Sequence, residues 1–157
     1  MRTGIAVLIG IVLCEAVGAL AGVATQSSVN TWYPTLAKPG FTPPDWLFAP
    51  VWITLYAMMG IAAGVVWTKR GKQRGVRPAL VAFGVQLVLN AAWSFVFFGA
   101  QSIGGGLVVI VLLLAAIAET IRRMAPLSRW AAMLLVPYLL WVAYATALNG
   151  ALWWLNG

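Results

Sequence analysis

The sequence predicts an all-α integral membrane protein in which five transmembrane helices form one bundle. Two observations carry this prediction. Of the 157 residues, 62% are hydrophobic and only 8% are charged, whereas a soluble domain has about 25% charged residues. The hydrophobic residues gather into runs long enough to cross a bilayer, which takes about 20 residues as a helix. The polar stretches between them are short, so residues 1–157 form a single membrane domain.

Each apolar run predicts one helix. We expect the helices at residues 4–25, 46–68, 79–100, 103–123 and 129–155. The first contains one charge, Glu15, and continues beyond the length of a signal-peptide core, so it is interpreted as a membrane helix. Gly60 and Gly64 lie one turn apart in the second, a spacing that lets another helix approach closely. Pro137 predicts a kink in the fifth.

The connection between the first and second helices is rich in proline and aromatic residues. Four prolines between positions 34 and 44 remove backbone donors and fix φ, which predicts an ordered, non-helical loop at residues 27–45. Trp32, Tyr33, Phe41, Trp46 and Trp52 accompany them. Such a segment suits a lid over a cavity for a flat, apolar ligand. It is also typical of an aromatic belt at the membrane surface.

The net charge of +7 does not indicate a nucleic-acid partner, because the basic clusters flank the apolar runs. Of the ten Lys and Arg residues, only Lys38 lies on the side of the proline-rich loop. The others lie near the N-terminus and in the second and fourth connections. The positive-inside rule therefore predicts a cytoplasmic N-terminus, with the loop and the C-terminus outside a cell membrane of prokaryotic type.

Residue usage excludes several chemistries. The chain has no His, and its one cysteine, Cys14, lies inside the first apolar run. Disulfide frameworks, cysteine metal sites and histidine ligation of haem iron or other metals are therefore excluded. No catalytic constellation is visible, and no cofactor is required by any motif.

Three of the predicted helices carry a face of aromatic and amide side chains. These faces comprise Trp52 and Tyr56 on the second helix, Gln86, Asn90, Trp93 and Phe97 on the third, and Tyr138, Trp141, Ala145, Leu148 and Asn149 on the fifth. If the faces converge, they enclose an aromatic chamber with a few hydrogen-bonding groups, the composition of a small-molecule site. The alternative is that the amides bond neighbouring helices and the aromatic rings fill a core.

Glu15 supports a different hypothesis. A carboxylate at membrane depth could exchange protons with a cationic substrate, which would make the chain a proton-coupled small-molecule exporter. A hydrogen-bonded Glu15, buried by close helix packing at Gly18 and Gly22, is the structural alternative. A third hypothesis is that the protein is a structural subunit of a membrane assembly and binds no ligand.

Three long motifs identify a family resemblance. WYPTLAKPGFTPPDWLFAPVWITLYAMMG, QLVLNAAWSFVFFGA and PYLLWVAYATALN lie on the second, third and fifth helices. In this order they resemble the translocator protein and tryptophan-rich sensory protein (TspO/MBR) family, formerly called peripheral-type benzodiazepine receptors. The resemblance spans nearly the whole chain. It implies a five-helix bundle, usually a homodimer, whose first loop closes a pocket for porphyrins and synthetic apolar ligands.

The resemblance also implies a set of pocket residues. Together with Trp32 from the loop and Tyr56 from the periodicity, the ligand-binding residues are Trp46, Pro50, Trp52, Asn90, Trp93, Trp141, Ala145 and Leu148. The implied function is a membrane receptor or sensor for tetrapyrroles such as protoporphyrin IX or haem, involved in their regulation, transport or degradation. Light-dependent porphyrin degradation would be the enzymatic version of that role. Lys38 is within reach of the propionates.

Two further expectations concern partners. Some animal members of the family carry a cholesterol-recognition pattern after the ATALN segment. Here GALWWLNG follows instead and lacks both the Tyr and the basic residue of that pattern, so the sequence does not support cholesterol recognition by it. The small residues Ala82, Gly84 and Ala91 on the third helix are candidates for the dimer contact.

Overall fold

The computed structural model describes residues 2–157, and within that range every regular element is helical. The elements are α1 (Thr3–Thr31), α2 (Asp45–Trp67), α3 (Val76–Ser94), α4 (Ile103–Met124), α5 (Arg129–Leu134) and α6 (Val136–Asn156), with a short 3-10 turn, η1 (Tyr33–Thr35), and a π-helical turn, η2 (Phe95–Gly99). They form five spans that are long and apolar enough to cross a membrane. The predicted fold class is confirmed.

The helix ends differ from the predicted ones where proline was read as a boundary. α1 continues to Thr31 because its sequence contains no proline before Pro34, and the hydroxyl of Thr31 bonds back to the carbonyl of Ser27 at 2.7 Å. The non-helical connection is therefore shorter than the expected 27–45. α3 begins at Val76 and includes Pro78, because a proline in the first turn removes a donor that has no partner there.

The fifth span is divided in two near its proline. α5 ends at Leu134, Leu135 adopts φ −88° and ψ −10°, and α6 begins at Val136. Pro137 stands at the second position of α6, where its missing N–H interrupts the hydrogen bonding of a continuous helix. The helix is thus interrupted at Leu135, two residues before Pro137, the residue at which the sequence predicted a kink.

Close packing of α1 on α2 depends on glycine. A Cβ added to Gly60 would overlap the backbone of Gly10 and Ile11, and a Cβ added to Gly64 would overlap the backbone of Val7. The glycine pair that predicted close approach therefore accommodates α1. The remaining main contacts join α3 to α4, α4 to α6 and α5 to α2.

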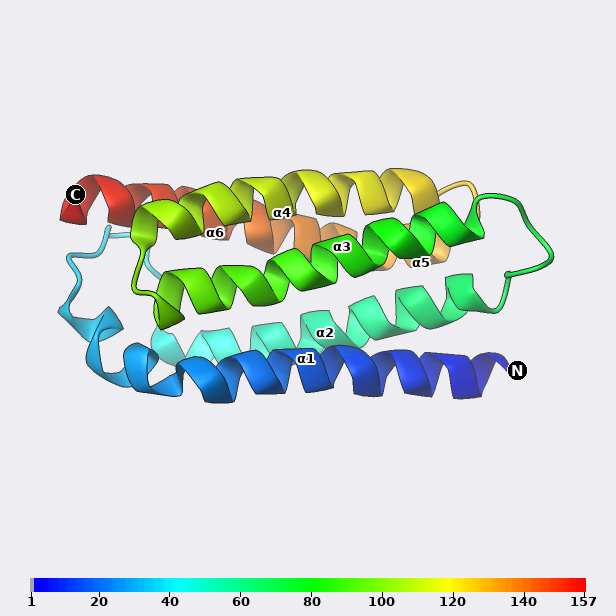
Figure 1. Ribbon diagram of the computed structural model, residues 1–157, viewed down its shortest axis with the longest axis horizontal. Coiled ribbons are helices and arrows are strands. Elements are labelled where there is room, and N and C mark those ends of the chain that lie inside the picture. The colour runs from blue at the N-terminus through cyan, green and yellow to red at the C-terminus, as the bar shows by residue number, and fades with distance from the viewer. Residues whose placement is uncertain (1) are drawn as a thin grey trace.

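The bundle has two distinct ends (Figure 1). One end gathers the N-terminus, the basic connection between α2 and α3, and the turn before α5; the other gathers the loop after α1, the turn between α3 and α4, and the C-terminus. Trp67 and Trp130 are exposed at the first end, and Trp46 and Trp154 at the second. Exposed tryptophans at both ends are typical of the two membrane surfaces.

Candidate functional site

Asn90 of α3 is the centre of a buried hydrogen-bond network. Its side-chain oxygen accepts from the Tyr56 hydroxyl of α2 at 2.5 Å, and its amide donates to the Tyr138 hydroxyl of α6 at 2.8 Å. Tyr138 donates in turn to Gln86 Oε1 at 2.7 Å. Asn90 is 2% exposed and Tyr138 0%. The predicted faces of α2, α3 and α6 therefore converge, and these polar groups satisfy one another.

A second polar contact lies nearer the loop end of α3. Trp93 Nε1 donates to Asn149 Oδ1 of α6 at 3.0 Å, and the Asn149 amide donates to the carbonyl of Ile103, the first residue of α4, at 2.9 Å. The Trp93 indole also stacks on Phe97, with ring centroids 5.3 Å apart and an interplanar angle of 28°. Its ring is thus oriented by both a hydrogen bond and a stacking partner.

Aromatic rings from α2 and α6 continue the wall of this interior. Trp52 packs against Tyr56 and Tyr138, with centroid separations of 5.7 Å and 6.4 Å. Trp141 packs edge-on against Phe48 at 6.1 Å. The Trp141 Nε1 atom is buried, and it has no hydrogen-bond partner within residues 2–157. This indole N–H is a donor that the surrounding side chains do not satisfy.

The segment after α1 covers the loop end of this interior. Tyr33 is only 7% exposed and packs against Phe97 and Phe98, with centroids 6.5 Å and 5.7 Å away. Trp32 meets Phe97 edge-on at 5.6 Å. Residues 32–44 therefore form a cover, with Trp32 and Tyr33 packed on the loop end of the bundle.

Hydrogen bonds from α6 also hold the cover in place. The Asn156 side chain accepts from the Ala37 amide and donates to the Ala37 carbonyl, both at 2.9 Å. The Tyr144 hydroxyl donates to the carbonyl of Phe41. Sequence reasoning did not find either fastening residue. Tyr144 could have been predicted, because it lies three positions after Trp141 and therefore near the same face of the helix. No pattern in the neighbouring residues points to Asn156.

The structure brings most of the predicted site residues together. Trp32, Trp52, Tyr56, Trp93, Trp141, Ala145 and Leu148 all belong to, or pack against, the buried hydrophobic clusters of the bundle. Asn90 is buried and bonded to Tyr56 and Tyr138. Trp46 and Pro50 do not join them, because they lie in the first turns of α2 and are exposed, Trp46 by 72%. Trp46 has the environment of an interfacial belt residue.

Glu15 lies outside this network. Its side chain is half-buried on α1, and no hydrogen bond or ion pair engages it within residues 2–157. Gly18, one turn further on, lies against the Tyr56 ring. The expectation of a hydrogen-bonded Glu15 is therefore wrong, because the glycine on this face brings α1 against an aromatic ring and supplies no polar partner.

Residues 2–157 contain no cluster of three His, Cys, Asp or Glu side chains arranged to hold a metal ion.

These features define a class: a polytopic helical membrane protein with a tryptophan-rich and tyrosine-rich interior under a packed extramembrane loop. Comparison with known proteins gives the family. The profile of the TspO/MBR family matches residues 10–155, and the chain belongs to this family.

Several relatives cover most of the chain. It is 46% identical to the tryptophan-rich protein TspO of Chlorobaculum tepidum, over 92% of this chain and 91% of that protein. It is 43% identical to the human translocator protein, over 78% and 73%. It is 36% identical to the tryptophan-rich sensory protein of Cereibacter sphaeroides, over 85% and 82%. Membership of this family supports the role of a membrane sensor or receptor.

Proposed function

We propose that the chain is a membrane receptor for flat tetrapyrroles, such as protoporphyrin IX or haem, which bind among the aromatic side chains of α2, α3 and α6 under residues 32–44. The observation that carries this proposal is the buried Trp141 indole N–H, which has no acceptor within residues 2–157. Nearly all buried polar groups in proteins have a partner. An acceptor atom on a ligand would complete this one.

The remaining chemistry of the interior supports the same ligand class. Trp52, Trp93 and Trp141 offer flat faces on which a macrocycle stacks through dispersion and quadrupole interactions. The Asn90 amide is already bonded to Tyr56 and Tyr138, so the polar edge of the ligand falls to other groups. We assign that edge to the Trp141 N–H and to the Lys38 ammonium on the covering loop.

Entry of a macrocycle requires the cover to move. Tyr33 is packed into the rings of Phe97 and Phe98, and its segment is tied to α6 by the Asn156 side chain. We propose that these contacts open on ligand entry and close behind the bound ring. Regulation, transport and light-dependent degradation of the porphyrin are all compatible with such a receptor.

The test removes the free donor and keeps the aromatic ring. Trp141→Phe in detergent-solubilised protein is compared with Trp154→Phe, since Trp154 is 83% exposed at the end of α6. Protoporphyrin IX binding is measured by equilibrium dialysis with absorbance detection. A lost hydrogen bond of about 0.5–1.5 kcal/mol predicts affinity about two- to tenfold weaker for Trp141→Phe. Saturable binding that both substitutions weaken equally would contradict the proposed role of Trp141, and unsaturable binding would contradict the receptor.

A proton-coupled exporter is the second candidate function. It is favoured by one observation: the half-buried Glu15 carboxylate has no partner among residues 2–157 and lies in a helix long and apolar enough to span a membrane. Ionisable groups at membrane depth are costly and mark proton pathways.

A homodimer through Ala82, Gly84 and Ala91 also stays a prediction. Gly84 has open space where a Cβ would stand, as such a contact requires.

A further inference from the structure

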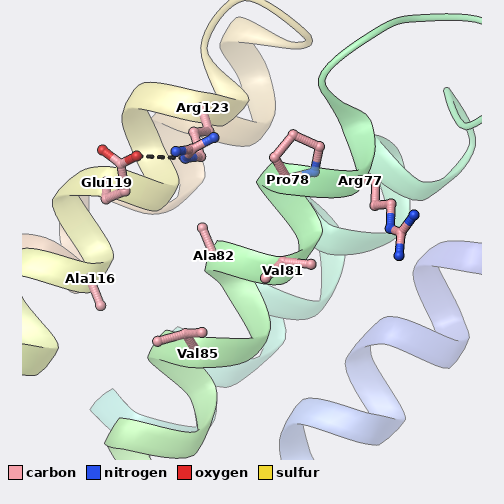
Figure 2. A pocket seen from close by; sticks show the side chains of 8 residues that line it. All are labelled: Arg77, Pro78, Val81, Ala82, Val85, Ala116, Glu119 and Arg123. Atoms are coloured by element: carbon pink, nitrogen blue, oxygen red, sulfur yellow. Dashed lines mark hydrogen bonds and ion pairs between the residues drawn. The ribbon is translucent and has the colours of Figure 1, made fainter.

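A groove of about 520 Å³ lies between α3 and α4 at the end of the bundle opposite the covering loop. Its floor is apolar and is formed by Val81, Ala82 and Val85 of α3 and Ala116 of α4. Figure 2 shows Ala82 and Ala116 pointing into the space between the two helices. Val81 and Val85 are exposed on the outside of the bundle, so the groove opens on the outer surface of the bundle.

A second groove of about 500 Å³ adjoins the first and shares Arg77, Pro78 and Val81 with it. It is bounded by the end of α2, the basic connection and the start of α3. Arg70 lines this second groove, and its guanidinium lies 3.9 Å from the centroid of the Trp67 ring. Stacking on the indole orients the guanidinium without occupying its hydrogen-bond donors.

The arginines that line the two grooves differ in whether a carboxylate neutralises them. Neither Arg70 nor Arg77 has a carboxylate partner within residues 2–157. The acid nearby, Glu119, is held in ion pairs by Arg122 at 2.7 Å and by Arg123 at 2.5 Å. In Figure 2 the Arg77 guanidinium points away from α4, so the apolar floor separates it from Glu119. The side shared with the second groove is therefore cationic.

We propose that the joined grooves bind one anionic phospholipid. The phosphate lies between the guanidinium groups of Arg70 and Arg77, and an acyl chain lies over Val81 and Val85. Val85 is eight residues beyond Arg77 along α3, about 12 Å deeper at a rise of 1.5 Å per residue, so the floor follows the direction in which an acyl chain enters the membrane. Basic pockets between helices at the cytoplasmic surface suit anionic head groups, and the positive-inside rule assigns this end to the cytoplasm.

The test compares two pairs of basic residues, Arg70 with Arg77 and Lys72 with Arg74, in or beside the connection between α2 and α3. Arg70→Gln/Arg77→Gln removes the two groove arginines. Lys72→Gln/Arg74→Gln removes the same charge from residues that line neither groove. Purified full-length protein is titrated with phosphatidylglycerol or with phosphatidylcholine of the same acyl chains, and bound lipid is counted by native mass spectrometry. We expect preference for phosphatidylglycerol to fall about fivefold for each groove arginine, the equivalent of about 1 kcal/mol, and to remain in the control.

Three results would overturn this proposal. Equal losses in the two double variants would mean that a diffuse basic surface attracts the lipid. Displacement of phosphatidylglycerol by an equal concentration of inorganic phosphate would mean that the acyl chain contributes nothing. Filling the floor with Ala82→Trp should also weaken lipid binding without changing any charge; if it changed the oligomeric state and left lipid binding intact, a second copy of the chain would be the occupant.

Discussion

Replacing Asn90 by Ala should destabilise the bundle, because Asn90 joins α2 and α6 to α3. The change removes the bonds of 2.5 Å to Tyr56 and 2.8 Å to Tyr138. Hydrogen bonds between membrane helices contribute about 0.6–1.7 kcal/mol each, so the pair accounts for about 1–3 kcal/mol. The Tyr138 hydroxyl keeps its bond to Gln86, but the buried Tyr56 hydroxyl loses its partner Asn90, and a buried group left without a partner adds about 1 kcal/mol. The expected loss in the free energy of unfolding is about 2–4 kcal/mol.

Unfolding by sodium dodecyl sulfate in mixed micelles, followed by circular dichroism, measures this loss. Thr120→Val is the control, because the buried Thr120 hydroxyl donates only within its own helix, to the carbonyl of Ala116 at 2.7 Å. We expect that variant to change the free energy by less than about 0.5 kcal/mol. A double-mutant cycle with Tyr56→Phe should show coupling between Tyr56 and Asn90. Strict additivity, or equal losses for Asn90→Ala and Thr120→Val, would refute the network as a source of stability.

Three further predictions concern packing, the cover and Glu15. Gly60→Ala should cost about 1–3 kcal/mol in the same unfolding assay because the new Cβ overlaps the backbone of α1, whereas Gly22→Ala, with open space around it, should cost nothing; equal effects would contradict the close-packing argument. Asn156→Ala removes both bonds to Ala37, so amide exchange at Ala37 should quicken about tenfold by mass spectrometry while exchange in α2 stays constant. Glu15→Gln should leave protoporphyrin IX affinity within about twofold, because an interaction absent from the site contributes no binding energy; loss of proton-dependent export in vesicles would instead support the exporter.

The five spans could be predicted from local sequence, although the ends of α1 and α3 could not, because the length and hydropathy of an apolar run are properties of neighbouring residues. Length and hydropathy predict the spans, since a bilayer accepts a helix of about 20 apolar residues. The helical period of 3.6 residues places Gln86, Asn90 and Trp93 on one face of α3. In the structure Gln86 and Asn90 are buried, and Trp93 packs against the buried core. Gly60 and Gly64 predict a close approach, although not that α1 is the helix that makes it.

Long-range contacts decided the rest. The sequence by itself determined which side chains share a face, but whether the amides stay free for a ligand or form hydrogen bonds with other side chains depends on how α2, α3 and α6 meet. In the fold, Asn90 is bonded to two tyrosines, and the Trp141 N–H has no partner among the residues that the structure describes. The fastening of Ala37 by Asn156 joins positions 119 residues apart, a distance over which no local pattern operates. Helix periodicity is a property of neighbouring residues, whereas hydrogen-bond pairing is a property of the assembled bundle.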